Sequence, residues 1–265
     1  MPTLQNQRAK SSGPMFELNA YADFSQEEFA SNYLGAIPNP SGFENIGDIS
    51  SIQKESNNLA QTAYQPRIRN QGSCGACWAF SAVAAFEKFY FDKKGQRLDF
   101  SQQHVVDCQR QAGGCSGAYP PVGLYFLANS GAALASAYPY KAVDGACQSS
   151  VTTYKIPTKL GEEGVSAARL TALVSAGIHV QIGVVANGAF RYLSKTDDVY
   201  DASASGECGR TINHAINAVQ TDSKGSYVRI INSFGTSWGV QGTKKIKMCS
   251  STNIWGTSSA LAYPY

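Results

Sequence analysis

A short run from Gln71 to Phe80 carries the residue types of a cysteine nucleophile. Cys77 stands where a nearly all-apolar stretch begins, and a helix starting there presents the positive end of its dipole to the sulfur. A thiol is a strong nucleophile only as the thiolate, which this field favours. Cys74 lies three residues earlier, and the side-chain amide of Gln71 lies six residues earlier. The run therefore indicates thiol chemistry with an amide donor beside it.

Three histidines are candidates for the base that activates this thiol: His104, His179 and His214. We expect His104 in a short helix and His179 in an apolar strand. His214 follows a polar residue and precedes an apolar run, and Asn232 stands 18 residues further on, at the end of a strand-like segment. An imidazole can activate the thiol, and an amide oxygen that accepts the ring N–H fixes its tautomer without adding charge.

Taken singly, each of these residues also has a plainer interpretation. A lone Cys77 is more often a buried structural thiol, and a lone His214 or Trp238 is more often part of a core. Cys74 and Cys77 together could form a redox pair or half of a zinc site. A zinc site needs a second ligand pair of similar spacing, which the sequence lacks, and a redox motif usually accompanies a βαβ pattern, which is also lacking. The joint order of glutamine, cysteine, histidine and asparagine favours nucleophilic catalysis, with no metal and no cofactor.

Composition limits the remaining function classes. The 265 residues suit one large domain or two packed lobes, and 43% are hydrophobic. The net charge is +3 with scattered Lys and Arg, which does not favour nucleic-acid binding. No apolar run approaches the roughly 18 residues of a membrane span, and the polar start gives no signal peptide. The seven cysteines leave one thiol over if the others pair, as in a secreted or lysosomal enzyme; seven reduced cysteines in a cytosolic protein are the alternative.

Periodicity and end signals predict an α+β chain. Ser25 can cap a helix with Glu27 and Glu28 in its first turn, and Ser101 can cap another. An apolar helix from Cys77 to about Phe91 is expected to be buried, and Gly95 lies just beyond its end. After about residue 160 the pattern becomes β-rich, with turn residues between strands. The predicted strand segments are residues 178–186, 212–219 and 227–232, and a further helix is expected over residues 122–129.

Four separated motifs, in order, resemble those of the papain family of cysteine proteases, the cathepsin L-like branch in particular. The spacing of 137 residues between Cys77 and His214 falls within the about 130–150 typical of that family. The resemblance implies a papain-like two-lobe fold with the active site in the cleft between a helical lobe, about 64–160, and a β-barrel-like lobe, about 161–265. The motifs are residues 71–80, residues 106–108 with 114–120, residues 213–215, and residues 232–239.

The same resemblance implies a role for each motif residue. Cys77 is the nucleophile of an endopeptidase that works through a thioester acyl-enzyme, and His214 is its base and later its acid. Asn232 orients His214, and Gln71 forms the oxyanion hole with the Cys77 backbone N–H. Trp238 shields the pair of His214 and Asn232 from water. The implied disulfides are Cys74–Cys115, Cys108–Cys147 and Cys208–Cys249.

Substrate contacts are implied at Gly117, Ala118, Trp238 and Ala260. Ala260 is expected at the base of the main specificity pocket. A small apolar residue there favours substrates with a bulky apolar side chain two residues before the cleaved bond. Ala118 stands where a second glycine is usual, and Phe234 stands where a tryptophan is usual. Protein or peptide substrates, a monomer, and a lysosomal, vacuolar or secreted location are the corresponding expectations, without nucleic acid or membrane partners.

The start of the chain resembles part of a cathepsin L-type propeptide. Residues 17–29 are similar to its last helix region, and its earlier helices are absent. Residues 35–60 are then expected to cross the cleft in reverse and block it, with the mature start near residues 44–55. We therefore divide the chain into a partial pro-segment, 1–50, that acts as an inhibitor, and a peptidase domain, 51–265. A catalytically idle or self-inhibited papain-fold protein with a binding role is the second hypothesis.

Overall fold

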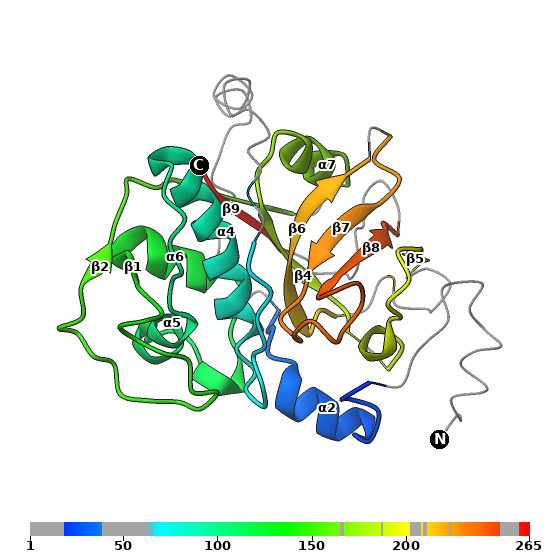
Figure 1. The fold of residues 1–265 in the computed structure, drawn as a ribbon, viewed down its shortest axis with the longest axis horizontal. Coiled ribbons are helices and arrows are strands. Elements are labelled where there is room, and N and C mark those ends of the chain that lie inside the picture. The colour runs from blue at the N-terminus through cyan, green and yellow to red at the C-terminus, as the bar shows by residue number, and fades with distance from the viewer. Residues whose placement is uncertain are drawn as a thin grey trace.

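Most of the helices lie on one side of the molecule, and the main sheet lies on the other side (Figure 1). The computed structural model describes residues 19–38, 64, 66–164, 167–186, 188–201, 208, 211–222, 224–249 and 260–265. Helix α4 lies at the boundary between the two sides and contacts strands β4, β6 and β9. The α+β prediction is therefore confirmed, with the helices first and most strands later in the chain.

The helical side is built around α4, Cys77–Lys94, which is buried on all faces over most of its length. It ends at Gly95, whose left-handed backbone (φ 66°) closes the last turn, as the sequence predicts. Gly123 lets α6 approach α4 closely, because a Cβ there would lie 2.7 Å from the Ala82 Cβ. The other elements of this side are α5 (Gln102–Cys108), η1 (Gly114–Ser116), α6 (Pro121–Ser130), β1 (Ala132–Ala133) and β2 (Thr153–Tyr154).

The β-rich side is one seven-stranded sheet in the order β3-β9-β4-β6-β7-β8-β5. All neighbours are antiparallel except β5 and β8. Where the chain is described, β3 and β5 stand at the two ends of this sheet. The strands are β3 (Leu160–Gly164), β4 (Val180–Val184), β5 (Val199–Asp201), β6 (His214–Thr221), β7 (Val228–Ile231), β8 (Thr243–Lys247) and β9 (Ala260–Pro264), accompanied by α7 (Ala167–Ser175) and η2 (Phe190–Tyr192).

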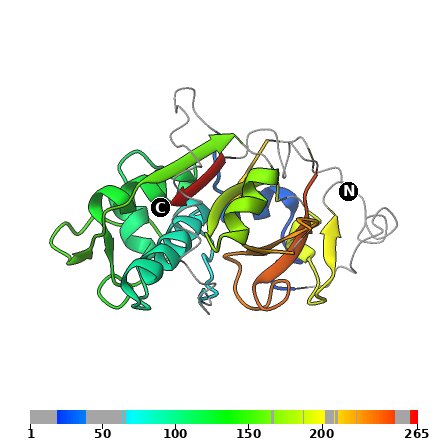
Figure 2. The ribbon, with the colours of Figure 1, turned by 90° about the horizontal axis from the view of Figure 1, so that it is seen from above.

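Helix α2, Gln26–Tyr33, lies beside the boundary between the two sides (Figures 1 and 2). It begins with the predicted capping box, in which the Ser25 hydroxyl accepts from the Glu28 N–H and the Glu28 carboxylate accepts from the Ser25 N–H. Its apolar face buries Phe29 and Tyr33 against the β-rich side.

Three disulfides cross-link the fold and are the three pairs that the resemblance implied. Two lie on the helical side, Cys74–Cys115 and Cys108–Cys147, and Cys208–Cys249 lies on the sheet side. Each joins residues about 40 apart, and a cross-link of that length stabilises a fold by roughly 2–5 kcal/mol. Cys77 is the free cysteine, so the chain holds no Cys74–Cys77 dithiol.

Candidate active site

Cys77 is the first residue of α4, so its sulfur lies at the positive end of the helix dipole. The side chain is fully buried and packs with Ala36 and Ala215. Burial raises the pKa of the Cys77 thiol to about 11, and backbone N–H groups, led by that of Ala215 and then that of Gly35, act in the opposite direction. The thiol is therefore protonated in this arrangement at neutral pH.

His214 opens β6, and Asn232 follows the last residue of β7, so the two strands bring their side chains together. The His214 Nε2 lies 2.8 Å from the Asn232 Oδ1, which also accepts the Ser233 N–H at 2.8 Å. Because Oδ1 is an acceptor, Nε2 carries the ring proton, and Nδ1 keeps a free lone pair. Nδ1 is buried and has no hydrogen-bond partner among the described residues. Burial lowers the pKa of His214 to about 4, opposed by the hydrogen bond to Asn232.

Phe234 covers the imidazole. Its ring centroid lies 4.8 Å from that of His214 with the planes tilted by 31°, and Phe190 approaches the same ring at 5.8 Å. Trp238 stands behind this layer, since its ring contacts Phe234 and Phe190 and its Nε1 donates to the Phe190 carbonyl. The shielding position that the resemblance gave to Trp238 is thus held by Phe234 in this chain.

Gln71 is fully buried and its side-chain amide is oriented by three contacts. Its Oε1 accepts from the Ser233 hydroxyl at 2.5 Å, so Nε2 is the donor end. Nε2 donates to the Cys74 carbonyl at 2.8 Å and to the Tyr33 carbonyl at 2.9 Å. The Gln71 Nε2 therefore points at two backbone carbonyls, that of Cys74, three residues before Cys77, and that of Tyr33, at the end of α2.

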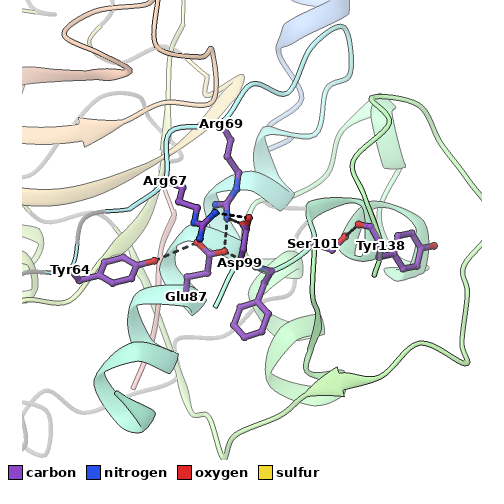
Figure 3. Close-up of polar contacts among 8 residues, drawn as sticks. Tyr64, Arg67, Arg69, Glu87, Asp99, Ser101 and Tyr138 are labelled. Carbon is purple, nitrogen blue, oxygen red and sulfur yellow. Dashed lines mark hydrogen bonds and ion pairs between the residues drawn. The ribbon is translucent and has the colours of Figure 1, made fainter. Parts of the chain in front are cut away.

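A buried ion-pair network holds the segment that leads to Gln71 against α4 (Figure 3). Arg69 contacts Glu87 through two hydrogen bonds, of 3.1 and 2.6 Å, and also pairs with Asp99. Glu87 is fully buried on α4 and further accepts from the Phe100 N–H and the Tyr64 hydroxyl. Burial raises the pKa of Glu87, and Arg69 opposes that shift. Breaking such a pair by removing one partner leaves an uncompensated buried charge.

Gly117 and Ala118 form a backbone edge that is paired with residues of the chain's own N-terminal part. The Ala118 N–H donates to the Gly35 carbonyl at 2.8 Å, and the Ile37 N–H donates to the Ala118 carbonyl at 3.0 Å. Ala36 and Ala118 form a parallel bridge. An extended peptide can therefore pair with this edge beside Cys77.

The same N-terminal segment passes directly over Cys77. The Ala36 N–H donates to the Asn213 carbonyl at 3.1 Å, so the segment contacts both sides of the molecule. Gly35 allows the crossing, because a Cβ there would lie 1.8 Å from the Gly75 carbonyl oxygen. Ala36 of this segment packs on Cys77 together with Ala215, and Cys77 is completely buried. The rest of the predicted crossing, residues 39–60, and the predicted mature start lie outside the described residues.

The other predicted residues fall elsewhere. Ala260 begins β9, and its side chain lies outside what the structure describes. The ring of His104 packs on Phe126 and Tyr138, and that of His179 packs on Tyr64, away from the thiol. Burial lowers the pKa of both rings. Within the described ranges no group of three His, Cys, Asp or Glu side chains is placed to hold a metal ion.

Two polar residues at the site were missed by sequence reasoning. Ser233, next to Asn232, orients Gln71 through its hydroxyl. Tyr140 donates to the Gln71 carbonyl from a loop 69 residues away. Ser233 lies inside a motif and could have been flagged, whereas no local signal marks Tyr140.

In the described part of the chain, no helix has the length and apolar character needed to cross a bilayer.

Comparisons with known proteins agree with this geometry. Residues 54–265 match the family model described as "Papain family cysteine protease". Caricain of Carica papaya is 35% identical over 232 residues, which cover 84% of this chain and 65% of caricain. Chymopapain of Carica papaya is 31% identical over 270 residues, covering 94% of this chain and 73% of chymopapain.

Solved structures give the same fold. The recombinant stem bromelain precursor superposes with a TM-score of 0.77 at 30% identity, covering 99% of this chain and 86% of that one. The cysteine protease CMS1MS2 of Carica candamarcensis, solved in complex with E-64, gives a TM-score of 0.65 at 34% identity, covering 76% of this chain and 93% of that one.

Proposed function

Because the chain belongs to the papain family of cysteine proteases, we propose that it hydrolyses peptide bonds through Cys77, His214 and Asn232. The observation that carries this proposal is the His214–Asn232 pair at 2.8 Å, which leaves a free lone pair on Nδ1. That lone pair suits a base for a thiol at the start of a helix. No metal or cofactor takes part.

The proposed reaction has two steps. His214 Nδ1 takes the Cys77 proton, and the sulfur attacks the substrate carbonyl carbon. Gln71 Nε2 and the Cys77 N–H donate to the resulting oxyanion. The protonated imidazole then gives its proton to the leaving amine, and a thioester remains on Cys77. In the second step His214 takes a proton from water as the water oxygen attacks the thioester carbon. The C–S bond then breaks to release the acid product, and His214 returns the proton to the Cys77 sulfur.

We propose that peptide substrates pair with the Gly117–Ala118 edge, where residues 35–37 now pair. Ala260 lining the pocket for the second residue before the cut, with a preference for bulky apolar side chains, is part of the same proposal. A helical lobe, about 64–160, and a β-rich lobe, about 161–265, make up the peptidase domain, 51–265.

We further propose that residues 1–50 are an inhibitory pro-segment and that the full chain is a latent form. The contacts of residues 33–37 with Gln71, Ala118 and Asn213 support this. The match to a precursor over 99% of this chain supports it as well. A monomer in a lysosome, vacuole or extracellular space fits this family and the three disulfides. A permanently self-inhibited binding protein is the second candidate, favoured by the complete burial of Cys77.

E-64 labelling separates the two. We expect slow labelling of Cys77 in the full chain and fast labelling after limited proteolysis removes residues 1–50, together with hydrolysis of a peptide substrate that has Phe or Leu two residues before the cut. A matched substrate with Asp at that position is expected to be cut poorly, and Cys77→Ala serves as the inactive control. A trimmed chain that takes up no E-64 and cuts no peptide would falsify the protease proposal and leave the binding protein.

A further inference from the structure

Gln71 is clamped through its backbone as well as its side chain. Its N–H donates to the Ser233 carbonyl at 2.9 Å, from the β-rich side. Its carbonyl accepts from the Tyr140 hydroxyl at 2.7 Å, from the loop that follows α6 and β1 on the helical side. The peptide group before the Cα of Gln71 is thus fixed by the β-rich side, and the peptide group after it is fixed by the helical side.

Tyr140 is itself held by the helix that carries Cys77. Its ring packs edge-on against Phe80, one turn along α4 from Cys77, with the centroids 4.8 Å apart and the planes at 88°. Burial raises the pKa of Tyr140, so its hydroxyl stays protonated and remains a donor at physiological pH. The ring is therefore a rigid connection from the Cys77 helix to the backbone of Gln71.

The loop around Tyr140 also supports the turn that follows Gln71. Gly72 has a positive φ of 58°, and a Cβ there would lie 3.2 Å from the Ala142 Cβ. This close fit places residues 140–142 directly against the 71–72 backbone. A rotation of the 71–72 peptide, which would swing the side-chain amide out of place, is opposed by both contacts.

We infer that Tyr140 is a positioning residue that fixes the Gln71 amide at the oxyanion site. The inference rests on the proposed function, because it assigns Gln71 Nε2 to the developing oxyanion. Tyr140 acts through Gln71 rather than on the substrate. An amide that is already in place stabilises the transition state, where the oxyanion develops, more than it stabilises the bound substrate. Loss of the hydroxyl is therefore expected to lower kcat and to leave KM nearly unchanged.

Tyr140→Phe tests the inference, with Tyr138→Phe as a matched control. Tyr138 loses the same hydroxyl two residues away, but that group bonds to Asp107 and the Ala146 carbonyl, and Figure 3 places Tyr138 well apart from the Arg69–Glu87 pair. The full chain is opened by limited proteolysis, its active sites are counted with E-64, and kcat and KM are measured on a peptide substrate. We expect Tyr140→Phe to lower kcat by roughly three- to tenfold, and Tyr138→Phe to change it by less than about twofold.

A double-mutant cycle shows whether Tyr140 acts through the amide. In the Gln71→Ala background the backbone carbonyl remains but the amide is gone, so Tyr140→Phe is expected to change kcat by less than about twofold. An equal loss in both backgrounds, or equal losses for Tyr140→Phe and Tyr138→Phe, overturns the inference while the proposed function stands. A wild-type chain that hydrolyses no peptide overturns both.

Discussion

Two adjacent stretches of the N-terminal segment meet the rest of the molecule in different ways. The first, residues 19–34, is held by side chains. Tyr21, Phe29 and Tyr33 surround Phe234, with ring centroids 5.2 to 6.1 Å from it, and the Tyr21 hydroxyl donates to the Phe234 carbonyl. Arg191 lies over the Phe29 ring and donates to the carbonyls of residues 24 and 25. We call this stretch the anchor.

The second stretch, residues 35–37, is held by its backbone, and we call it the crossing. Its hydrogen bonds go to the backbone of Asn213 and Ala118, and the Ile37 side chain is 47% exposed. Buried aromatic rings contribute far more to the free energy of packing than exposed rings do. Backbone hydrogen bonds, by contrast, form with almost any amino-acid sequence. In the latent form proposed above, the anchor supplies affinity and specificity, and the crossing supplies the block.

The anchor also touches the site through Phe234, the residue that covers His214. Phe29 and Tyr33 form T-shaped pairs with Phe234, while the His214 ring lies closer and more nearly parallel to it. The residue that replaces the usual tryptophan is therefore shared between the imidazole and the N-terminal segment.

Phe29→Ala is expected to have the largest effect because it removes a fully buried ring from the anchor. Truncating a buried phenylalanine costs about 3–5 kcal/mol, so the rate of E-64 labelling of Cys77 in the full chain should rise by roughly two to four orders of magnitude. Glu27→Ala, on the exposed face of the same helix, is the control and should leave the rate nearly unchanged. A rise below about tenfold for Phe29→Ala would show that the anchor does not hold the crossing in place.

His214→Gln is expected to remove an acid sensitivity of the full chain. The folded state holds His214 neutral with a pKa of about 4, so between pH 6.5 and 4 the unfolded chain binds more protons at this position. Stability therefore falls as pH falls through that window, by about 3 kcal/mol from this group alone. Urea unfolding of both chains at several pH values measures it. A parallel pH dependence of both would mean that His214 is not buried neutral under the crossing.

Gly35→Ala is expected to open the crossing and leave the anchor in place. A Cβ at residue 35 would lie 1.8 Å from the Gly75 carbonyl oxygen, so the segment must shift and lose backbone hydrogen bonds worth about 0.5–1.5 kcal/mol each. Labelling of Cys77 should rise by roughly ten- to a hundredfold. The free energy of unfolding of the full chain, measured in urea, should change little because the anchor stays in place. Unchanged labelling would place the block elsewhere than at Gly35.

Ile37→Ala is expected to have the smallest effect. The side chain is largely exposed, and the backbone N–H that pairs with Ala118 is kept. Surface changes of this kind are usually within about 0.5 kcal/mol, so E-64 labelling should change by no more than about twofold. A larger increase would show that the crossing binds through a side-chain pocket as well as its backbone, and the contrast with the anchor would weaken.

Local signals predicted α2, α4, α5 and α6, but not α7, which lies where a β-rich pattern was expected. Ser25, Ser101 and Gly95 gave the helix ends because caps depend on neighbours a few residues away. The sheet was predicted only in its central strands. Strand β3, Leu160–Gly164, has two glycines and two glutamates and no apolar alternation, yet it pairs with β9 about 100 residues later. Such a strand exists because of its partner, so its own sequence carries little signal.

The arrangement around the imidazole shows the same limit. Trp238 and Phe234 both stand in the asparagine motif, and the spacing does not say which ring faces His214. The tight turns at Gly235 and Gly239, both with positive φ, direct Phe234 to the imidazole and Trp238 to Phe190. The order of the aromatic layers is a consequence of backbone geometry, which the motif alone does not give.

Residue types and their spacing along the chain identify the groups available for chemistry: a thiol at a helix start, a histidine and an asparagine at strand ends, and a glutamine before the thiol. Residue type and local backbone preference are properties of short segments, so they can be read from the chain directly. The contacts by which Ser233 and Tyr140 clamp Gln71 from opposite sides, and by which Gly35 lies against Gly75 near Cys77, came from the tertiary structure alone. Those contacts join residues 40 to 162 positions apart, and their geometry is fixed only when the two halves pack around α4.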